Sequence, residues 1–199
     1  MFPQQIKNFI EAFSGLPGIG PRQAMRLAFK LVAGGKNKIE ELSKSISELK
    51  NLKLCSQCFF IHSNFENLCD ICKNPNRRKN IIMIVEKETD IISLERPRKF
   101  NGRYLILGEL NKAGILESGQ KLRLNNLKTF ISKELGGQAE EIIIATNPTT
   151  YGDLSASIIT KELAGFAKKI TRLGRGIPTG GEIEFADEDT LGAALERRN

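Results

Sequence analysis

The sequence is poor in histidine and has no long apolar run. Its one histidine, His62, lies between two pairs of cysteines, so a Ser-His-Asp or Cys-His catalytic site would have to use that residue. The longest apolar stretch is Ile81–Val85, far short of the roughly 20 residues that cross a bilayer. No signal peptide is visible at the N-terminus, and no G-x-x-x-x-G-K-[ST] motif predicts a P-loop. We therefore expect a cytoplasmic protein.

The chain has 199 residues, of which 40% are hydrophobic and 27% charged, as in ordinary folded domains. Its excess of positive charge is concentrated in the N-terminal 80 residues. Residues 1–53 contain nine Lys/Arg and four Asp/Glu, and residues 54–80 contain four and two, whereas residues 81–199 contain seventeen of each. Such a basic segment favours a polyanionic partner, nucleic acid before membrane. A solvated basic face is the alternative.

The four cysteines form two C-x-x-C pairs separated by ten residues: Cys55, Cys58, Cys69 and Cys72. Two such pairs bring four thiolates around one point, which suits tetrahedral zinc with no open position for water. The sequence thus predicts one structural zinc ion. Two disulfides fit a cytoplasmic protein poorly, and a redox site needs one pair only. His62 is a competing ligand in principle, but we expect it to be a loop residue.

The first 53 residues are predicted to be helical. Apolar residues recur at helical spacing over 6–13 and 24–31, and a third helix is expected over 38–50. The first two helices are joined by Pro17-Gly18-Ile19-Gly20-Pro21, in which Pro21 suits a first helical turn.

This helical pair resembles a helix-hairpin-helix motif, which binds DNA backbone without sequence preference. Gly18 and Gly20 allow close backbone approach, and their N–H groups are suited to a phosphate oxygen. Arg22 and Arg26 are four residues apart and so share one face of the second helix. These four residues are the predicted DNA-binding residues. An ordinary αα-hairpin with a glycine turn is the alternative.

The rest of the chain alternates between predicted strands and helices, which indicates an α/β domain with a largely parallel sheet flanked by helices. After a loop over 174–181 we expect a short strand at 183–185 and a final helix from near Asp187. The predicted strands are 81–85, 103–107, 141–146 and 170–173, and the predicted helices are 89–96, 127–135 and 154–168.

Two strand ends carry polar residues. Glu86 directly follows the strand at 81–85, Asp90 follows four residues later, and Asn147-Pro148-Thr149 follows the strand at 141–146. Ligands of α/β folds bind at such ends. Glu86 and the A-T-N-P segment resemble a Toprim domain, the catalytic module of topoisomerases and primases. Solvated strand-end acids are the alternative.

The order of motifs is similar to that of the RecR family of bacterial recombination-repair proteins over essentially the whole chain. The motifs are L-P-G-I-G-P, the two C-x-x-C pairs, I-V-E-K-E-T-D, A-T-N-P-T and R-G-I-P-T-G-G-E. The resemblance implies a helix-hairpin-helix domain over 1–53, a four-cysteine zinc finger over 54–77 and a Toprim domain over 78–173. A C-terminal Walker B-like segment and helix occupy 174–199.

The resemblance implies a protein without catalytic residues. Catalytic Toprim domains pair the strand-end Glu with Asp-x-Asp to hold Mg²⁺, but here those two positions are Asn147 and Thr149. Neutral oxygens hold Mg²⁺ weakly, so strand cleavage is not expected. Without a P-loop, the Walker B-like segment is interpreted as a structural or subunit-exchange element.

Further expectations also come from the resemblance. The family implies a ring-shaped homotetramer around gapped or single-strand/double-strand DNA, associated with the nucleoid, that promotes recombinase loading. RecO and RecF are the implied partners, with Glu86 and Asp90 on the partner-binding surface. Two other functions stay open: a Mg²⁺-dependent Toprim nuclease or topoisomerase-like enzyme using Glu86 and Asp153, and a zinc-ribbon module that binds RNA.

Overall fold

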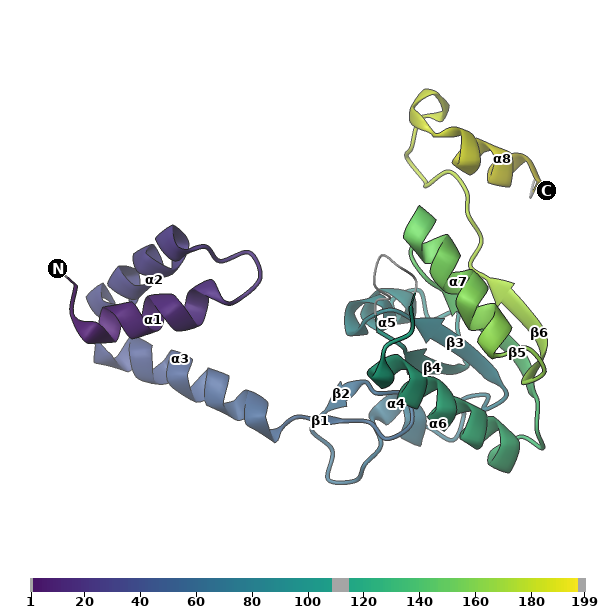
Figure 1. Ribbon diagram of the computed structural model, residues 1–199, viewed down its shortest axis with the longest axis horizontal. Coiled ribbons are helices and arrows are strands. Elements are labelled where there is room, and N and C mark those ends of the chain that lie inside the picture. Colours follow the sequence, from purple (N-terminus) through teal and green to yellow (C-terminus); the bar gives the residue numbers. More distant parts are fainter. Residues whose placement is uncertain (1, 109–114, 197–199) are drawn as a thin grey trace. The chain divides into compact units, whose positions relative to one another are not determined.

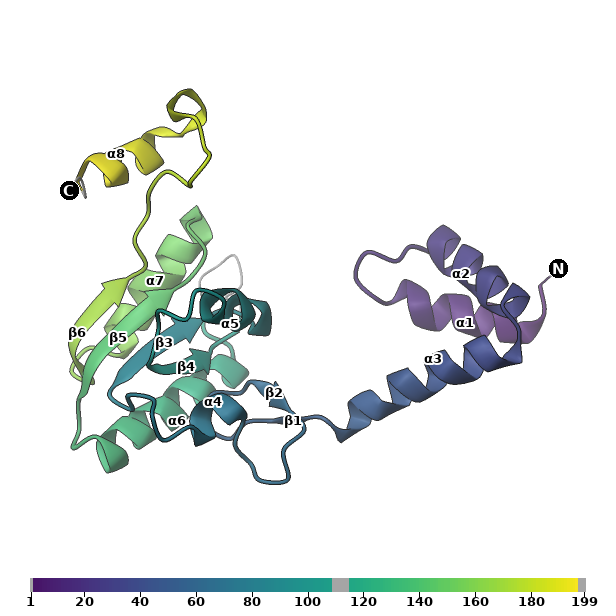
Figure 2. The same cartoon turned by 180° about the vertical axis from the view of Figure 1, so that it is seen from behind.

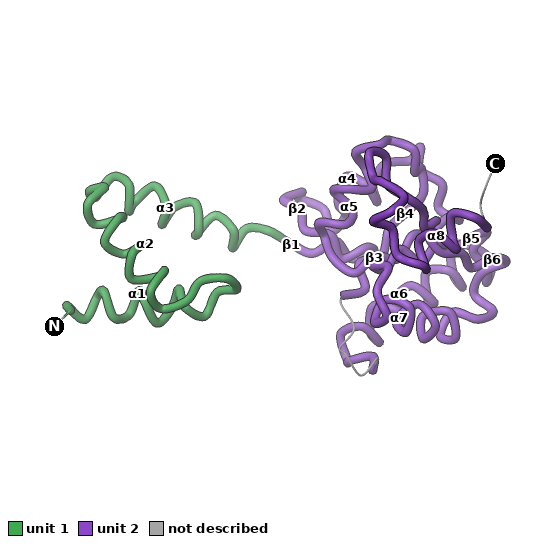
Figure 3. Tube along the Cα trace, turned by 90° about the horizontal axis from the view of Figure 1, so that it is seen from above, with its two compact units in different colours: residues 1–52 green, residues 53–199 purple. Residues whose placement is uncertain are grey.

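The computed structural model describes residues 2–108 and 115–196, and the chain divides into two compact units. Unit 1 comprises Met1–Leu52 and unit 2 comprises Lys53–Asn199 (Figure 3). The division falls between the predicted helical hairpin and the first cysteine. The cysteine-containing segment therefore belongs to the same unit as the sheet.

Unit 1 consists of the three predicted helices and a closing 3-10 turn. Pro21 occupies the first turn of the second helix, as expected, since its missing N–H has no partner there in any case. The elements are α1 (Gln4–Ser14), α2 (Pro21–Ala33), α3 (Lys36–Glu48) and η1 (Leu49–Asn51).

Unit 1 buries few side chains. Its only fully buried apolar residues within 2–52 are Ala24 and Ala28, both on α2, where their small side chains let α1 approach closely. Phe9 and Phe13 of α1 stack at 3.9 Å between ring centroids. Neither α1 nor α3 contains a buried residue.

Unit 2 is built on a four-stranded sheet in the order β4-β3-β5-β6, and all three strand pairs are parallel. One of the two inner strands is the apolar run Ile81–Val85, because a strand with neighbours on both sides and helices on both faces needs apolar residues throughout. The strands are β3 (Ile81–Val85), β4 (Arg103–Ile106), β5 (Ala139–Ala145) and β6 (Ala167–Arg172).

Helices cover both faces of this sheet. Ile82 and Ile84 point to the face covered by α6 and α7, in front of the sheet in Figure 1, whereas Met83 and Val85 point to the face that carries α5, seen in Figure 2. This alternation follows from the two-residue period of a strand. The helices are α5 (Glu88–Glu95), α6 (Ser118–Glu134) and α7 (Thr150–Glu162).

The cysteine-containing segment packs on the same face as α5. Phe60 and Ile71 contact the core residues of that face, and the Ile106 N–H of edge strand β4 donates to the Cys58 carbonyl at 2.9 Å. The segment thus covers part of the free edge of β4. Its elements are β1 (Lys53–Leu54), β2 (Ile61–His62) and α4 (Asp70–Lys73).

The prediction of a C-terminal strand at Ile183–Phe185 is wrong. These residues form a 3-10 turn, η2, and their two large apolar side chains are mostly exposed, because no neighbouring strand pairs with them in the described part of the chain. The expected final helix is present as α8 (Glu188–Glu196). Among the described residues, no helix is long and apolar enough to span a membrane.

Candidate nucleic-acid interface and metal centre

The turn between α1 and α2 depends on glycine. Gly18 has a φ of +79°, which residues with a side chain rarely adopt. The turn is closed by a hydrogen bond from the Ile19 N–H to the Leu16 carbonyl at 3.1 Å, and the Ala24 N–H donates to the Gly20 carbonyl at 2.9 Å. The first N–H groups of α2 are therefore left at an exposed end of the hairpin.

Arg22 and Arg26 are exposed on α2, directly after this turn. Neither side chain takes part in an ion pair among the described residues, although Lys38 of the same unit does pair with Glu41. Two exposed guanidinium groups beside free helix N–H groups form a surface that attracts anions.

The four cysteines come together as their spacing predicted. Their sulfur atoms all lie within 4.8 Å of one another, all four side chains are buried, and none forms a disulfide. A tetrahedral metal with bonds of about 2.3 Å to sulfur places its ligands roughly 3.8 Å apart. The cluster is therefore positioned to bind a metal ion, with four sulfur atoms that close the coordination shell.

The sulfur atoms already interact strongly with one another. Hydrogen bonding to Cys58 lowers the pKa of the Cys55 thiol, and the same contact with Cys55 raises the pKa of Cys58, because only one of the two sulfurs can hold the shared proton. A bound cation would favour the thiolate at every position.

The sequence had suggested that His62 is a loop residue, and this prediction is wrong. It lies on β2 and is 8% exposed, and its Nδ1 accepts a hydrogen bond from the Asn64 N–H at 3.2 Å. A short pairing of β2 with β1 places it there. It is not a member of the metal-binding group, which consists of cysteines only in the described part of the chain.

The two polar strand ends meet, because β3 and β5 are parallel neighbours. Glu86 is 9% exposed, and the side-chain amide of Asn147 donates to its Oε2 in a very short contact. The Asn147 backbone N–H approaches Oε1 at 3.4 Å. The group that Asn147 presents to Glu86 is therefore an N–H donor and not a carboxylate oxygen.

Asp90 has a local structural role. Its Oδ2 accepts hydrogen bonds from the Lys87 N–H at 3.0 Å and the Glu86 N–H at 3.2 Å, which caps the N-terminus of α5. Thr149 caps α7 in the same manner, since its hydroxyl accepts from the Gly152 N–H at 3.1 Å. The polar residues at both strand ends therefore have partners within the chain.

Asp153, a candidate catalytic carboxylate from the sequence, instead pairs with two arginines that the sequence did not single out. Arg172 lies 2.6 Å from its Oδ1, and Arg175 contacts the same oxygen. The hydrogen bond from Arg172, assisted by Arg175, lowers the pKa of Asp153. The only sequence signal for this pairing was that β6 ends in a basic residue.

Three family models match the chain. A Toprim domain covers residues 80–174, a RecR helix-hairpin-helix domain covers 6–50, and a RecR C-terminal domain covers 176–199. Together they define a Toprim protein with an N-terminal helix-hairpin-helix domain.

Curated relatives match the whole chain. One from Frankia casuarinae, named recombination protein RecR, is 35% identical over 200 residues, which cover 100% of this chain and 98% of the relative. Another of that name, from Clostridium perfringens, is 38% identical over 200 residues, covering 99% of this chain and 97% of the relative. The chain therefore belongs to the RecR family of recombination proteins.

Proposed function

We propose that the protein is a non-enzymatic mediator of recombinational DNA repair. It binds gapped DNA or single-strand/double-strand junctions through backbone phosphates, with RecO and RecF as partners, and promotes loading of a recombinase onto protein-coated single strands. The family supports the recombination-repair role. The observation that carries the DNA contact is the exposed pair Arg22 and Arg26 beside the Gly18–Gly20 turn.

The proposed ring tetramer is supported by the apolar surface of unit 1. A small helical unit that leaves large apolar side chains on its surface is suited to contact another protein surface, here a second copy of the chain. Ring closure adds avidity to hairpins that each bind DNA weakly. The large apolar side chains exposed on α2, α3 and η1 are Phe29, Val32, Ile39, Ile46 and Leu49.

The ion proposed for the cysteine cluster is zinc, with a structural role. Four thiolates favour zinc over hard cations such as Mg²⁺, and a closed shell leaves no position for an activated water. Bound zinc holds the two cysteine-containing turns together and so fixes Phe60 and Ile71 against the sheet.

The absence of strand cleavage is part of the proposal. The amide of Asn147 donates to Glu86, and Asp153 is neutralised by Arg172 and Arg175, so these acids do not form a carboxylate cluster for Mg²⁺. We assign the contact with RecO or RecF to the strand-end edge around Glu86 and Asp90. Mg²⁺-dependent nicking of supercoiled DNA that is abolished by Glu86→Gln would contradict this proposal.

The DNA contact is tested by Arg22→Ala combined with Arg26→Ala. Each lost phosphate contact reduces the slope of log affinity against log salt by about 0.9, so the slope should fall by about 2 for each protomer on the DNA. The control is Lys36→Ala with Lys44→Ala, which removes the same charge from exposed positions on α3. Fluorescence anisotropy with gapped DNA measures both. Equal effects of the two double variants would show that the hairpin is not the contact.

A further inference from the structure

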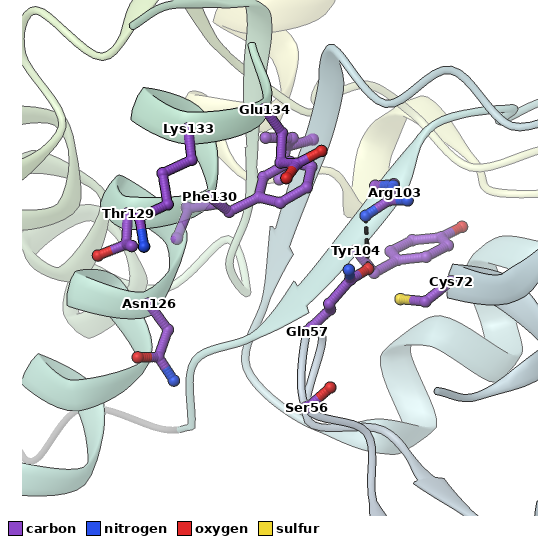
Figure 4. A pocket seen from close by; sticks show the side chains of 12 residues that line it. Ser56, Gln57, Cys72, Arg103, Tyr104, Asn126, Thr129, Phe130, Lys133 and Glu134 are labelled. Atoms are coloured by element: carbon purple, nitrogen blue, oxygen red, sulfur yellow. Dashed lines mark hydrogen bonds between the residues drawn. The ribbon is translucent and has the colours of Figure 1, made fainter. Parts of the chain in front are cut away.

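A pocket of about 440 Å³ lies between α6 and the cysteine-containing segment, beside edge strand β4 (Figure 4). This volume is within the range of small-ligand sites. Ile82, Leu127 and Phe130 supply apolar lining, and Gln57 and Arg103 face the pocket from the opposite side to α6. Cys72 of the cysteine cluster also lines this pocket, whereas none of the hairpin or strand-end residues discussed above does.

The unusual group in this pocket is Arg103. Its side chain comes from β4, the residue is only 8% exposed, and its guanidinium lies 4.9 Å from the centroid of the Phe130 ring. Its NH1 donates to the side-chain oxygen of Gln57 at 2.5 Å, the contact drawn as a dashed line in Figure 4. A neutral amide is thus its hydrogen-bond partner.

Arg103 has no carboxylate within 4 Å in the described part of the chain. A guanidinium has five N–H donors, and the nitrogens of Arg103 that lack an acceptor are not sealed from solvent, since His62 Nε2 is the one fully buried unpartnered side-chain atom among the described residues. Arg103 lines the pocket, so its guanidinium is within reach of a ligand bound there. A largely buried cation without a counter-ion is costly, and a bound anion would relieve that cost.

The other charges select the kind of anion. Lys133 and Glu134 also line the pocket and offset one another, so Arg103 supplies the excess positive charge among these three side chains. The cysteine cluster adjoins the pocket through Cys72 and, with its thiolates, adds negative charge beside it. A single carboxylate, whose two oxygens fit the guanidinium fork, meets less repulsion from Glu134 and the cysteine cluster than a phosphate dianion would. The apolar lining adjoins Arg103 and favours an apolar group attached to that carboxylate.

We propose that this pocket binds a carboxylate carried on a small apolar group. The carboxylate pairs with Arg103, and the apolar group lies against Ile82, Leu127 and Phe130. The source is either a free small acid or an acidic side chain flanked by apolar residues in a segment of another protein. The inference is independent of the DNA contact, because that contact lies in unit 1 and the pocket lies within unit 2.

The probe for this site is phenylacetate, compared with the neutral phenylacetamide, added to the full-length protein. Methyl NMR of Ile82 and Leu127 reports binding. We expect saturable shifts at millimolar phenylacetate and at least tenfold weaker binding of phenylacetamide. Equal binding of the two compounds, or no binding of phenylacetate, would overturn the proposal.

Arg103→Gln should abolish the shifts caused by phenylacetate. The matched control is Arg123→Gln, because the Arg123 guanidinium also lies 4.9 Å from an aromatic ring, that of Phe59, but does not line the pocket. If Arg103→Gln fails to fold, Arg103→Lys keeps the charge, loses the fork and should still weaken binding several-fold. Shifts that are unchanged in a folded Arg103 variant would overturn the proposal.

A second arm distinguishes the two sources. The acetylated and amidated peptide Gly-Leu-Glu-Leu-Gly presents a carboxylate between apolar side chains. Tighter binding than phenylacetate, with the same dependence on Arg103, identifies a protein segment as the occupant. Weaker binding identifies a free small acid.

Discussion

Units 1 and 2 differ in how they hold their helices together. Within unit 1, Ala24 and Ala28 are the only fully buried apolar residues in the part that the structure describes. Unit 2 buries large aliphatic side chains on both faces of its sheet, among them Ile84 and Ile159 on one face and Val85 on the other, each 0% exposed. Since apolar burial contributes about 25 cal/mol per Å², the two units receive very different stabilisation from their own cores.

This difference indicates a division of roles. Unit 2 has the two-sided core expected of a self-sufficient α/β domain, to which the cysteine cluster is attached. Unit 1 leaves large apolar side chains exposed, which we propose contact a second copy of the chain, and its structure depends on local helix–helix packing and on Gly18. The predictions below separate these two sources of stability.

The largest effect is expected from loss of the metal. Cys58→Ser should reduce the bound zinc to well below one equivalent and unfold the cysteine-containing segment, since a structural zinc site supplies about 10–16 kcal/mol of apparent binding free energy. Metal analysis and amide hydrogen exchange measure both. Ser56→Ala is the control, and the helices of unit 1 should keep their exchange protection. A full equivalent of zinc in Cys58→Ser would contradict the four-cysteine site.

Core substitutions should distinguish the units next. Ile142→Ala should lower the free energy of unfolding by about 2–5 kcal/mol, because Ile142 is fully buried between β3 and β6. Ile46→Ala on α3, where Ile46 is 47% exposed, should cost the monomer only about 0.5 kcal/mol but should decrease the oligomer mass. Urea unfolding and light scattering measure the two effects. An unchanged mass in Ile46→Ala would remove this residue from the subunit interface.

Two glycines are needed for different reasons. A Cβ at Gly152 would lie 1.8 Å from the Asn147 carbonyl oxygen, so Gly152→Ala should cost about 1–3 kcal/mol or more. A Cβ at Gly18 meets nothing within 4 Å, and Gly18→Ala should cost about 1–2 kcal/mol from its positive φ alone. Gly192→Ala in α8 is the control and should not destabilise, because it has open space and no positive φ. Thermal unfolding ranks the three.

The smallest effect concerns Asp153. Its lowered folded-state pKa means that pairing with Arg172 and Arg175 stabilises the fold above the unfolded pKa of about 3.9 and is lost as pH falls through the folded value. Since Asp153 and Arg172 are 45% and 36% exposed, Asp153→Asn should cost only about 0.5 kcal/mol near neutral pH.

That difference from the wild type should shrink at about pH 3, as urea unfolding would show. In unit 1, Glu41→Gln breaks a pair with Lys38 in which both side chains are more than half exposed, and it should cost less than Asp153→Asn. A larger cost for Glu41→Gln than for Asp153→Asn would contradict the stronger stabilising role assigned to the Asp153 pairs.

Much of the fold follows from the sequence where one pattern dominates. The β-branched run Ile81–Val85 is a strand over its whole predicted length, and the two C-x-x-C pairs converge as their spacing requires. The start of α6 was missed, because buried Gln120 and exposed Leu122 obscure the helical pattern in its first turns. The end of α7 was placed too late, since Gly165, with a φ of +88°, allows the chain to turn before β6.

The candidate sites likewise divide into those that local sequence spacing predicts and those that it does not. The cysteine cluster and the arginine pair are local in sequence, so spacing alone could find them. The contacts of Asn147 with Glu86, Arg175 with Asp153 and Arg103 with Gln57 join residues that are 61, 22 and 46 positions apart. Only the parallel pairing of the strands and the packing of the cysteine-containing segment on β4 bring them together.

The bond between Asn147 and Glu86 has a consequence for the conditions under which the protein is handled. The buried Glu86 carboxylate accepts its hydrogen bonds from Asn147 of the same chain. This edge of the sheet therefore needs no dissolved Mg²⁺ to stay folded. A chelating agent should therefore act through the cysteine cluster and, because Phe60 and Ile71 pack on the sheet, through the face that this segment covers. The contact between Asn147 and Glu86 should persist under the same treatment.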